Sequence, residues 1–364
     1  MKKARFTGSA LALAVAALLA AAGGALAADT KPPSYPNQAD GDVVVPDFAL
    51  SNGEHLANAK FHYTTLGTPQ RDASGAITNG VLLLHGTTGS GRNFLNPSLG
   101  GELFGPGQPL DAAKYFIILA DGIGHGGSSK PSDGLKGRFP HYGYVDAVEG
   151  QYLTVTKGLG IKHLKLVAGT SMGGMQTWIW GERHPGMMDA LMPIASQPVA
   201  ISGRNMLWRQ LIIDAIRNDP DWKGGEYTTP PAGYTHALPI FNIMVNNAAI
   251  LQQQAPSRAA ATTLYGQWVA DYGRTVDAND YLYWFESSYD YDPAPDLEKI
   301  KAKLVAVNFA DDLLNPAELG VMEAAMTRIP TGRYVLIPAS DQTRGHQTLT
   351  QAKVWKGALD EVLK

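Results

Sequence analysis

Residues 164–176 read Leu-Lys-Leu-Val-Ala-Gly-Thr-Ser-Met-Gly-Gly-Met-Gln, and this stretch decides the fold. The apolar run at 164–168 is typical of a strand buried in a parallel sheet, and a helix is expected to begin near Gly174. Between the two, residues 169–173 spell Gly-x-Ser-x-Gly in a strand–turn–helix context, which is what makes this motif informative. Because glycines flank the serine, the turn can be sharp, and the Ser171 hydroxyl is expected to be exposed at the carboxyl end of the sheet.

Other apolar runs of strand length lie on both sides of this stretch. They occupy residues 43–45, 60–65, 80–85, 115–120, 190–195, 304–308 and 334–337. Helical patterns lie between them, for example at 146–159 and 175–183. Strands that alternate with helices form βαβ units, so the sequence predicts an α/β fold with a mostly parallel central sheet flanked by helices.

One interval breaks this alternation. About a hundred residues after Ser196 contain no comparable strand run, but they do contain helical patterns at 205–216, 242–254 and 259–272. We interpret residues 199–300 as a helical cap inserted between two strands of a main domain that spans residues 28–364. The cap contains Trp208, Trp222, Trp268 and Trp284, which could line an apolar pocket or pack the cap onto the core.

A serine hydroxyl is a weak nucleophile at neutral pH, so it needs a base and a carboxylate that orients the base. With this motif the acid precedes the histidine in the chain. His346 follows the last predicted strand and is the expected base. Asp311 and Asp312 both follow the strand before it. Adjacent side chains on a turn point in different directions, so only one of them can serve, and we prefer Asp311.

The anion that forms during acyl transfer needs two backbone donors. We expect them to be the amide of Met172, which follows the nucleophile, and the amide of Thr87, which follows the strand ending at His85. Residues 86–91 also spell Gly-x-x-x-x-Gly, but no Lys-Ser/Thr pair follows, so nucleotide binding is not expected. His125 lies in a turn-rich loop, where we expect it to stabilise the turn rather than line the pocket.

Composition excludes several classes of protein. The 364 residues include no cysteine, so thiol nucleophiles, disulfides and thiolate metal sites are ruled out. A formal net charge of −3 provides no basic surface for nucleic acid. No metal-binding motif occurs, and we expect neither a metal nor a cofactor.

The first 27 residues are typical of a signal peptide. Lys2, Lys3 and Arg5 precede an uncharged apolar run at 10–22, and residues 25–27 (Ala-Leu-Ala) form a cleavage site after Ala27. The apolar run is too short to span a membrane comfortably, so we expect no stable membrane anchor. The mature protein is expected in the periplasm or outside the cell. The sequence does not distinguish a monomer from a homodimer.

The chain resembles the α/β-hydrolase superfamily and, within it, the homoserine O-acetyltransferase-like branch. The resemblance lies in residues 169–176, 215–227 and 278–283, in Asp311-Asp312-Leu313, and in Gly345-His346. The Asp-x-Leu pattern of the branch favours Asp311 as the acid. Two positions depart from the branch. Gln347 stands where an aspartate usually meets the substrate amino group, and residues 237–239 (Ala-Leu-Pro) stand where an arginine usually binds the substrate carboxylate.

These departures and the predicted export indicate which reaction to expect. A neutral pocket does not favour a zwitterionic amino acid, and acetyl-CoA is not expected outside the cytosol. We therefore expect a serine hydrolase that cleaves a small carboxylic ester, or an amide, through an acyl-enzyme. The alternative is an acyltransferase of the homoserine O-acetyltransferase type that moves the acyl group to an alcohol.

Overall fold

The computed structural model describes residues 35–275 and 277–364, and the statements below concern this part of the chain. The predicted signal segment, residues 1–27, lies outside the described residues. Within them, no helix is both long and apolar enough to cross a membrane.

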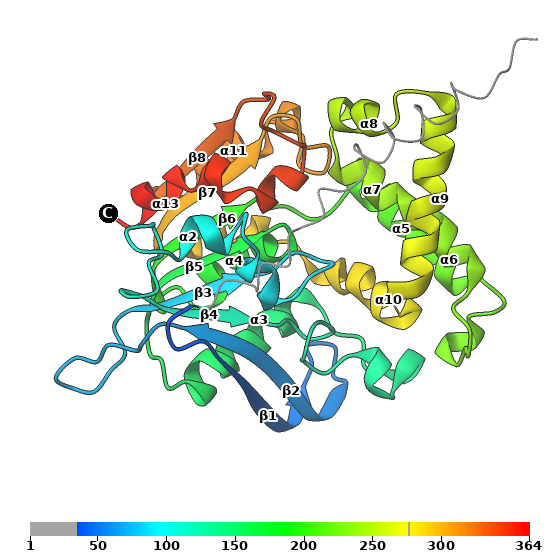
Figure 1. Cartoon of the computed structure of the whole chain (residues 1–364). Helices are drawn as coiled ribbons and strands as arrows, with labels where there is room; N and C mark the ends of the chain where they lie inside the picture. Colours follow the sequence, from blue (N-terminus) through cyan, green and yellow to red (C-terminus); the bar gives the residue numbers. More distant parts are fainter. Residues whose placement is uncertain (1–34, 276) are drawn as a thin grey trace, which may run out of the picture. The chain divides into compact units, whose positions relative to one another are not determined.

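The described residues form an eight-stranded sheet with the order β1-β2-β4-β3-β5-β6-β7-β8 (Figure 1). The strands are β1 (Ala39–Ala49), β2 (His55–Leu66), β3 (Gly80–Leu84), β4 (Phe116–Ala120), β5 (Leu164–Thr170), β6 (Met188–Ile194), β7 (Lys303–Phe309) and β8 (Gly332–Ile337). β1 pairs antiparallel with β2, and β2 with β4, whereas every pair from β4 to β8 is parallel. The predicted mostly parallel sheet is therefore confirmed.

Helices cover both faces of this sheet. Main-domain helices are α2 (Gly100–Leu103), α3 (Tyr144–Leu153), α4 (Met172–Arg183), α11 (Val321–Met326), α12 (Ala352–Trp355) and α13 (Gly357–Val362). Leu82 and Leu84 of β3 pack in the core cluster that contains residues of α3 and α4, while Val81 and Leu83 pack in the cluster that contains α13. Successive side chains of a strand point to opposite faces, so a strand buried on both faces must be apolar throughout.

A group of helices lies between β6 and β7, as the break in alternation predicted. It comprises α5 (Gly203–Arg217), α6 (Ala232–Ala237), α7 (Pro239–Val245), α8 (Ala248–Gln254), α9 (Arg258–Thr275) and α10 (Ala278–Glu286). Figure 1 shows them gathered beside the sheet. Residues of α5, α6, α7 and α10 form a separate apolar cluster, which includes Trp208 and Phe285. We call α5–α10 the cap.

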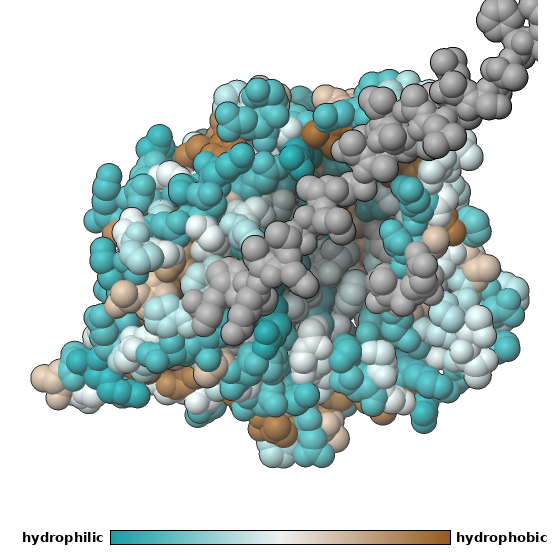
Figure 2. Space-filling view, viewed as in Figure 1, coloured by the Kyte–Doolittle hydropathy of each residue, from teal (hydrophilic) through white to brown (hydrophobic). Residues whose placement is uncertain are grey.

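The single helix predicted over residues 242–254 is wrong, because the chain forms two helices there. Asn247 has extended backbone between α7 and α8, and its side chain accepts a hydrogen bond from the Ile250 amide. An asparagine that satisfies a free amide in this way starts a new helix. On the face shown in Figure 2, the described surface is mainly polar, with small apolar patches.

Candidate active site

Ser171 stands on the turn between β5 and α4. Its backbone has φ 55° and ψ −114°, a conformation that non-glycine residues rarely adopt. A Cβ atom at Gly169 would lie 2.2 Å from the Gly173 carbonyl oxygen, and one at Gly173 would lie 2.1 Å from the Leu84 carbonyl oxygen. Glycine is thus required at positions 169 and 173 because α4 packs directly against the sheet. This close packing also holds Ser171 in its strained backbone conformation.

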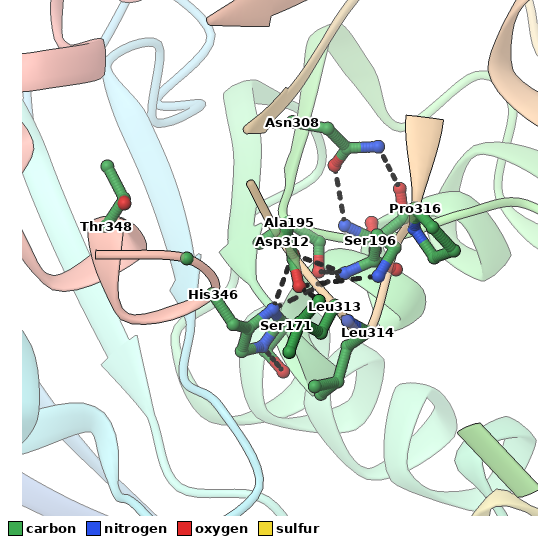
Figure 3. Close-up of polar contacts among 12 residues, drawn as sticks. Ser171, Ala195, Ser196, Asn308, Asp312, Leu313, Leu314, Pro316, His346 and Thr348 are labelled. Carbon is green, nitrogen blue, oxygen red and sulfur yellow. Dashed lines mark hydrogen bonds and ion pairs between the residues drawn. The ribbon is translucent and has the colours of Figure 1, made fainter. Parts of the chain in front are cut away.

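His346 comes from the loop that follows β8 and meets Ser171. Its Nε2 lies 2.8 Å from the Ser171 Oγ, and both side chains are buried. Its Nδ1 lies 2.7 Å from Oδ2 of Asp312, which follows β7 (Figure 3). The structure therefore joins a hydroxyl, an imidazole and a carboxylate in one hydrogen-bonded row at the carboxyl end of the sheet.

The expectation that Asp311 is the acid is wrong in this geometry. One Asp311 oxygen accepts hydrogen bonds from the Asn247 side-chain amide, the Thr343 hydroxyl and the Gly345 amide. The two aspartates point in different directions from the turn after β7, and only Asp312 faces the imidazole. Asp311 instead connects the start of α8 in the cap to the loop that carries His346.

The environment of Asp312 keeps it ionised. Burial alone would raise the pKa of this carboxyl, but the adjoining His346 and hydrogen bonds from Asn315 and the Leu314 amide hold it below its usual value. An ionised carboxylate on Nδ1 keeps a hydrogen on that nitrogen, which leaves Nε2 free to accept the serine proton.

A cavity of about 160 Å³ opens onto this row. Its walls include Ser171, His346, Thr87, Phe241 of α7 and Gln347, and none of its described lining residues is Asp, Glu, Lys or Arg. Leu238 belongs to residues 237–239, which stand where an arginine is usual in the homoserine O-acetyltransferase-like branch. Its side chain is buried in the cap core and does not line this cavity. A larger cavity of about 460 Å³ is lined by Asn315 and other residues but does not include Ser171, so we place the site in the smaller one.

The two predicted amide donors lie beside the serine. Met172 is the first residue of α4, so its N–H has no partner inside the helix. Thr87 lines the same cavity as Ser171, and among the described residues its N–H has no acceptor. A Cβ atom at the neighbouring Gly86 would lie 3.5 Å from the Ser171 Cβ. Two free amides near one hydroxyl are suited to binding an oxyanion.

His85 supports this loop, a role that the sequence analysis missed. Its Nδ1 lies 2.8 Å from the Gly86 carbonyl oxygen, and its Nε2 accepts a hydrogen bond from the Gly122 amide. Burial lowers the pKa of His85 to about 4, so the ring is neutral with its hydrogen on Nδ1. Because a trans peptide directs C=O and N–H in opposite directions, this bond fixes the Thr87 N–H on the side away from His85. The sequence feature that could have indicated this role is the position of His85, directly before the loop that carries Thr87.

No cluster of three or more metal-binding side chains occurs among residues 35–275 and 277–364.

The sheet order, the inserted cap and the serine at the turn after β5 together are the architecture of the α/β-hydrolase fold. Residues 79–230 match the family model described as alpha/beta hydrolase fold. The sequence relatives of the chain include homoserine O-acetyltransferases, which agrees with the resemblance noted in the sequence.

Three proteins illustrate these relationships. The homoserine O-acetyltransferase of Gluconobacter oxydans is 28% identical over 348 aligned residues, covering 82% of this chain and 85% of that protein. The homoserine O-acetyltransferase structure from Bacillus anthracis superimposes with a TM-score of 0.77 at 19% identity, over 90% of this chain and 98% of that one. Esterase E22 gives 0.76 at 19% identity, over 90% and 100%. The fold is therefore common to an acyltransferase and an esterase, and does not by itself select the reaction.

Proposed function

We propose that this protein transfers an acyl group from a small ester through a covalent intermediate on Ser171. The observation that carries the proposal is the row of hydrogen bonds from Ser171 to His346 and from His346 to Asp312, at 2.8 Å and 2.7 Å. Such a row activates a hydroxyl that would otherwise be unreactive at neutral pH.

The reaction has two halves that use the same groups. The Ser171 Oγ attacks the carbonyl carbon while His346 Nε2 takes its proton, and the Thr87 and Met172 amides bind the resulting oxyanion. His346 then gives the proton to the leaving alkoxide, which departs as an alcohol and leaves the acyl group on Ser171. In the second half, His346 takes a proton from an acceptor hydroxyl, the acceptor attacks the acyl carbon, and Ser171 recovers its proton.

The identity of the acceptor separates two candidate functions. The homologues support the acyltransferase alternative better than the hydrolase that the sequence led us to expect, since they include a homoserine O-acetyltransferase and a homoserine O-succinyltransferase. We therefore place transfer to an alcohol first. Thr87, Gln347 and the other lining residues of the cavity include no Asp, Glu, Lys or Arg, which favours an acceptor without an ammonium or carboxylate group.

Hydrolysis is the second candidate, and one observation favours it. Among the described residues, nothing in the cavity wall offers a counter-charge to an amino acid acceptor, whereas water needs none. The same neutral wall is compatible with an amide in place of the ester.

One assay separates the two candidates. Purified protein is given p-nitrophenyl acetate alone, then with homoserine, and then with an uncharged short alcohol, while acetate and acetylated acceptor are quantified. Acetylated alcohol in excess of free acetate supports transfer, and acetate alone supports hydrolysis. If Ser171→Ala releases p-nitrophenol as fast as wild type, the proposed chemistry is wrong.

We also propose that the protein is exported. The proposal is supported by the charged start and apolar run of residues 2–22 together with the cleavage site after Ala27. Cell fractionation and N-terminal sequencing test it. A mature chain that begins at Ala28 outside the cytosol is expected, and an uncleaved cytosolic chain would contradict it.

A further inference from the structure

A tryptophan of the cap is connected to the oxyanion loop through one histidine. Trp284 of α10 stacks on the His125 ring, with centroids 5.0 Å apart and planes 11° from parallel. The Trp284 indole also donates a hydrogen bond of 2.7 Å to the Gly124 carbonyl, one residue before His125. The His125 Nε2 lies 2.8 Å from the carbonyl oxygen of Thr87.

His125 also contacts a second buried histidine. It is fully buried, and its ring centroid lies 5.0 Å from that of His85, with the two planes tilted by 60°. The Nδ1 of His85 in turn lies 2.8 Å from the Gly86 carbonyl oxygen. The carbonyls on both sides of the Thr87 amide, those of Gly86 and Thr87, are thus each in contact with a buried imidazole. Two fixed carbonyls leave the intervening N–H little freedom to rotate.

We propose that His125 and Trp284 are positioning residues that let the cap hold the Thr87 amide where it binds the oxyanion. The inference rests on the proposed function and extends it, because it makes the cap part of the catalytic geometry. Loss of the stack would leave the substrate cavity in place but loosen the peptide that stabilises the transition state.

The proposed role of His125 requires one particular tautomer of its ring. Burial lowers the pKa of His125 to about 3, so the ring is neutral at neutral pH and carries a single N–H. Its Nδ1 lies 2.9 Å from the Ile123 carbonyl, within the same turn. The proposal requires the hydrogen on Nε2, where it is donated to Thr87.

The chain offers a matched control for the tryptophan. Trp222 is also half-buried in the cap, and its indole donates a 2.8 Å hydrogen bond to Asn279, away from His125. Trp222→Leu and Trp284→Leu therefore remove similar packing and one hydrogen bond each, but only the second removes the stack on His125.

The test compares wild type, Trp284→Leu, Trp284→Phe, Trp222→Leu, His125→Ala and His125→Gln on p-nitrophenyl acetate. Each variant is checked for folding by thermal melting. We expect Trp284→Leu and His125→Ala to lower kcat about 10- to 100-fold with KM within about twofold, since oxyanion interactions are made in the transition state. We expect Trp222→Leu to retain kcat. Trp284→Phe keeps an aromatic face and His125→Gln keeps a donor, so each should recover part of the loss.

An inhibitor provides a second readout. A trifluoromethyl ketone forms an oxyanion on the serine, so its Ki should rise in parallel with the loss of kcat/KM. Equal kcat losses in Trp284→Leu and Trp222→Leu, or an unchanged Ki, would overturn the inference. Inactivity of the wild-type protein would instead overturn the proposed function, which keeps the two failures distinct.

Discussion

The site depends on which of two neighbouring carboxylates faces an imidazole. Asp311 and Asp312 are chemically identical, yet one Asp312 oxygen bonds His346, whereas one Asp311 oxygen accepts hydrogen bonds from three groups that shape the histidine loop. Gly345 has φ 65°, which allows that loop to turn tightly over Asp311 before His346.

Replacement of each aspartate by asparagine should separate their roles. Asp312→Asn should lower kcat by about 10³- to 10⁴-fold, because an amide no longer stabilises the correct ring form or the imidazolium. Asp311→Asn should change kcat less than about threefold, since its amide oxygen can still accept the three hydrogen bonds. Steady-state kinetics on one ester checks both variants. The opposite order of effects would restore Asp311 as the acid.

At the scale of residues, the sequence was sufficient to predict that His346 lies beside Ser171. It was not sufficient to choose the aspartate that faces the histidine. The motif and the chain order point to Ser171 and His346 directly. The choice between Asp311 and Asp312 depends on the backbone angles of the turn after β7 and on a loop more than thirty residues downstream, and neither follows from local pattern.

At the scale of elements, the first turn of α4 lies so close to the sheet that there is no room for a side chain at Gly173. The Cβ of an alanine at Gly173 would lie 2.1 Å from the Leu84 carbonyl oxygen, which belongs to the backbone of β3 and cannot easily move. The strand and helix pattern of the main domain was predictable because buried strands must be apolar on both faces. The break between α7 and α8 was not, since it depends on one capping side chain, that of Asn247.

Gly173→Ala should therefore destabilise the protein strongly. We expect a loss of about 3 kcal/mol or more in the free energy of unfolding, at the upper end of overpacking effects. Gly186→Ala is the control, because nothing lies within 4 Å of a Cβ there. Urea titration measures both, and equal stability of the two variants would contradict the packing described for α4.

At the scale of the whole molecule, one half-buried acid on α4, Glu182, should make stability depend on pH. Burial, and next the charge of Asp296, raise the pKa of Glu182 from 4.5 to about 8, while Lys299 opposes the shift. Its Oε1 is buried without a hydrogen-bond partner among the described residues. The folded protein therefore keeps a proton on Glu182 that the unfolded chain loses, and this contribution to stability falls as pH rises from 4.5 towards 8.

Glu182→Gln removes that proton equilibrium. The difference in Tm between Glu182→Gln and wild type should grow in favour of the variant from about pH 5 to about pH 8 and then level off. Melting curves across this range check it. A difference that stays constant with pH would mean that Glu182 is ionised in the folded protein.

The choice of acceptor also depends on the whole molecule, because the cavity is lined by residues of both the cap and the main domain. Sequence pattern predicts the fold, the cap and the nucleophile, but the cavity wall is assembled from Thr87, Phe241 and Gln347, which lie far apart in the chain. Which residues form this neutral wall becomes visible only once the chain is folded.

The central claim is that Ser171 is the reactive nucleophile, and covalent labelling followed by peptide mapping tests it most directly. Folded protein is treated with a fluorophosphonate, digested and analysed by mass spectrometry. We predict a single phosphonate adduct, located on Ser171. Intact protein that stays unlabelled, or an adduct on a different residue, would contradict the account.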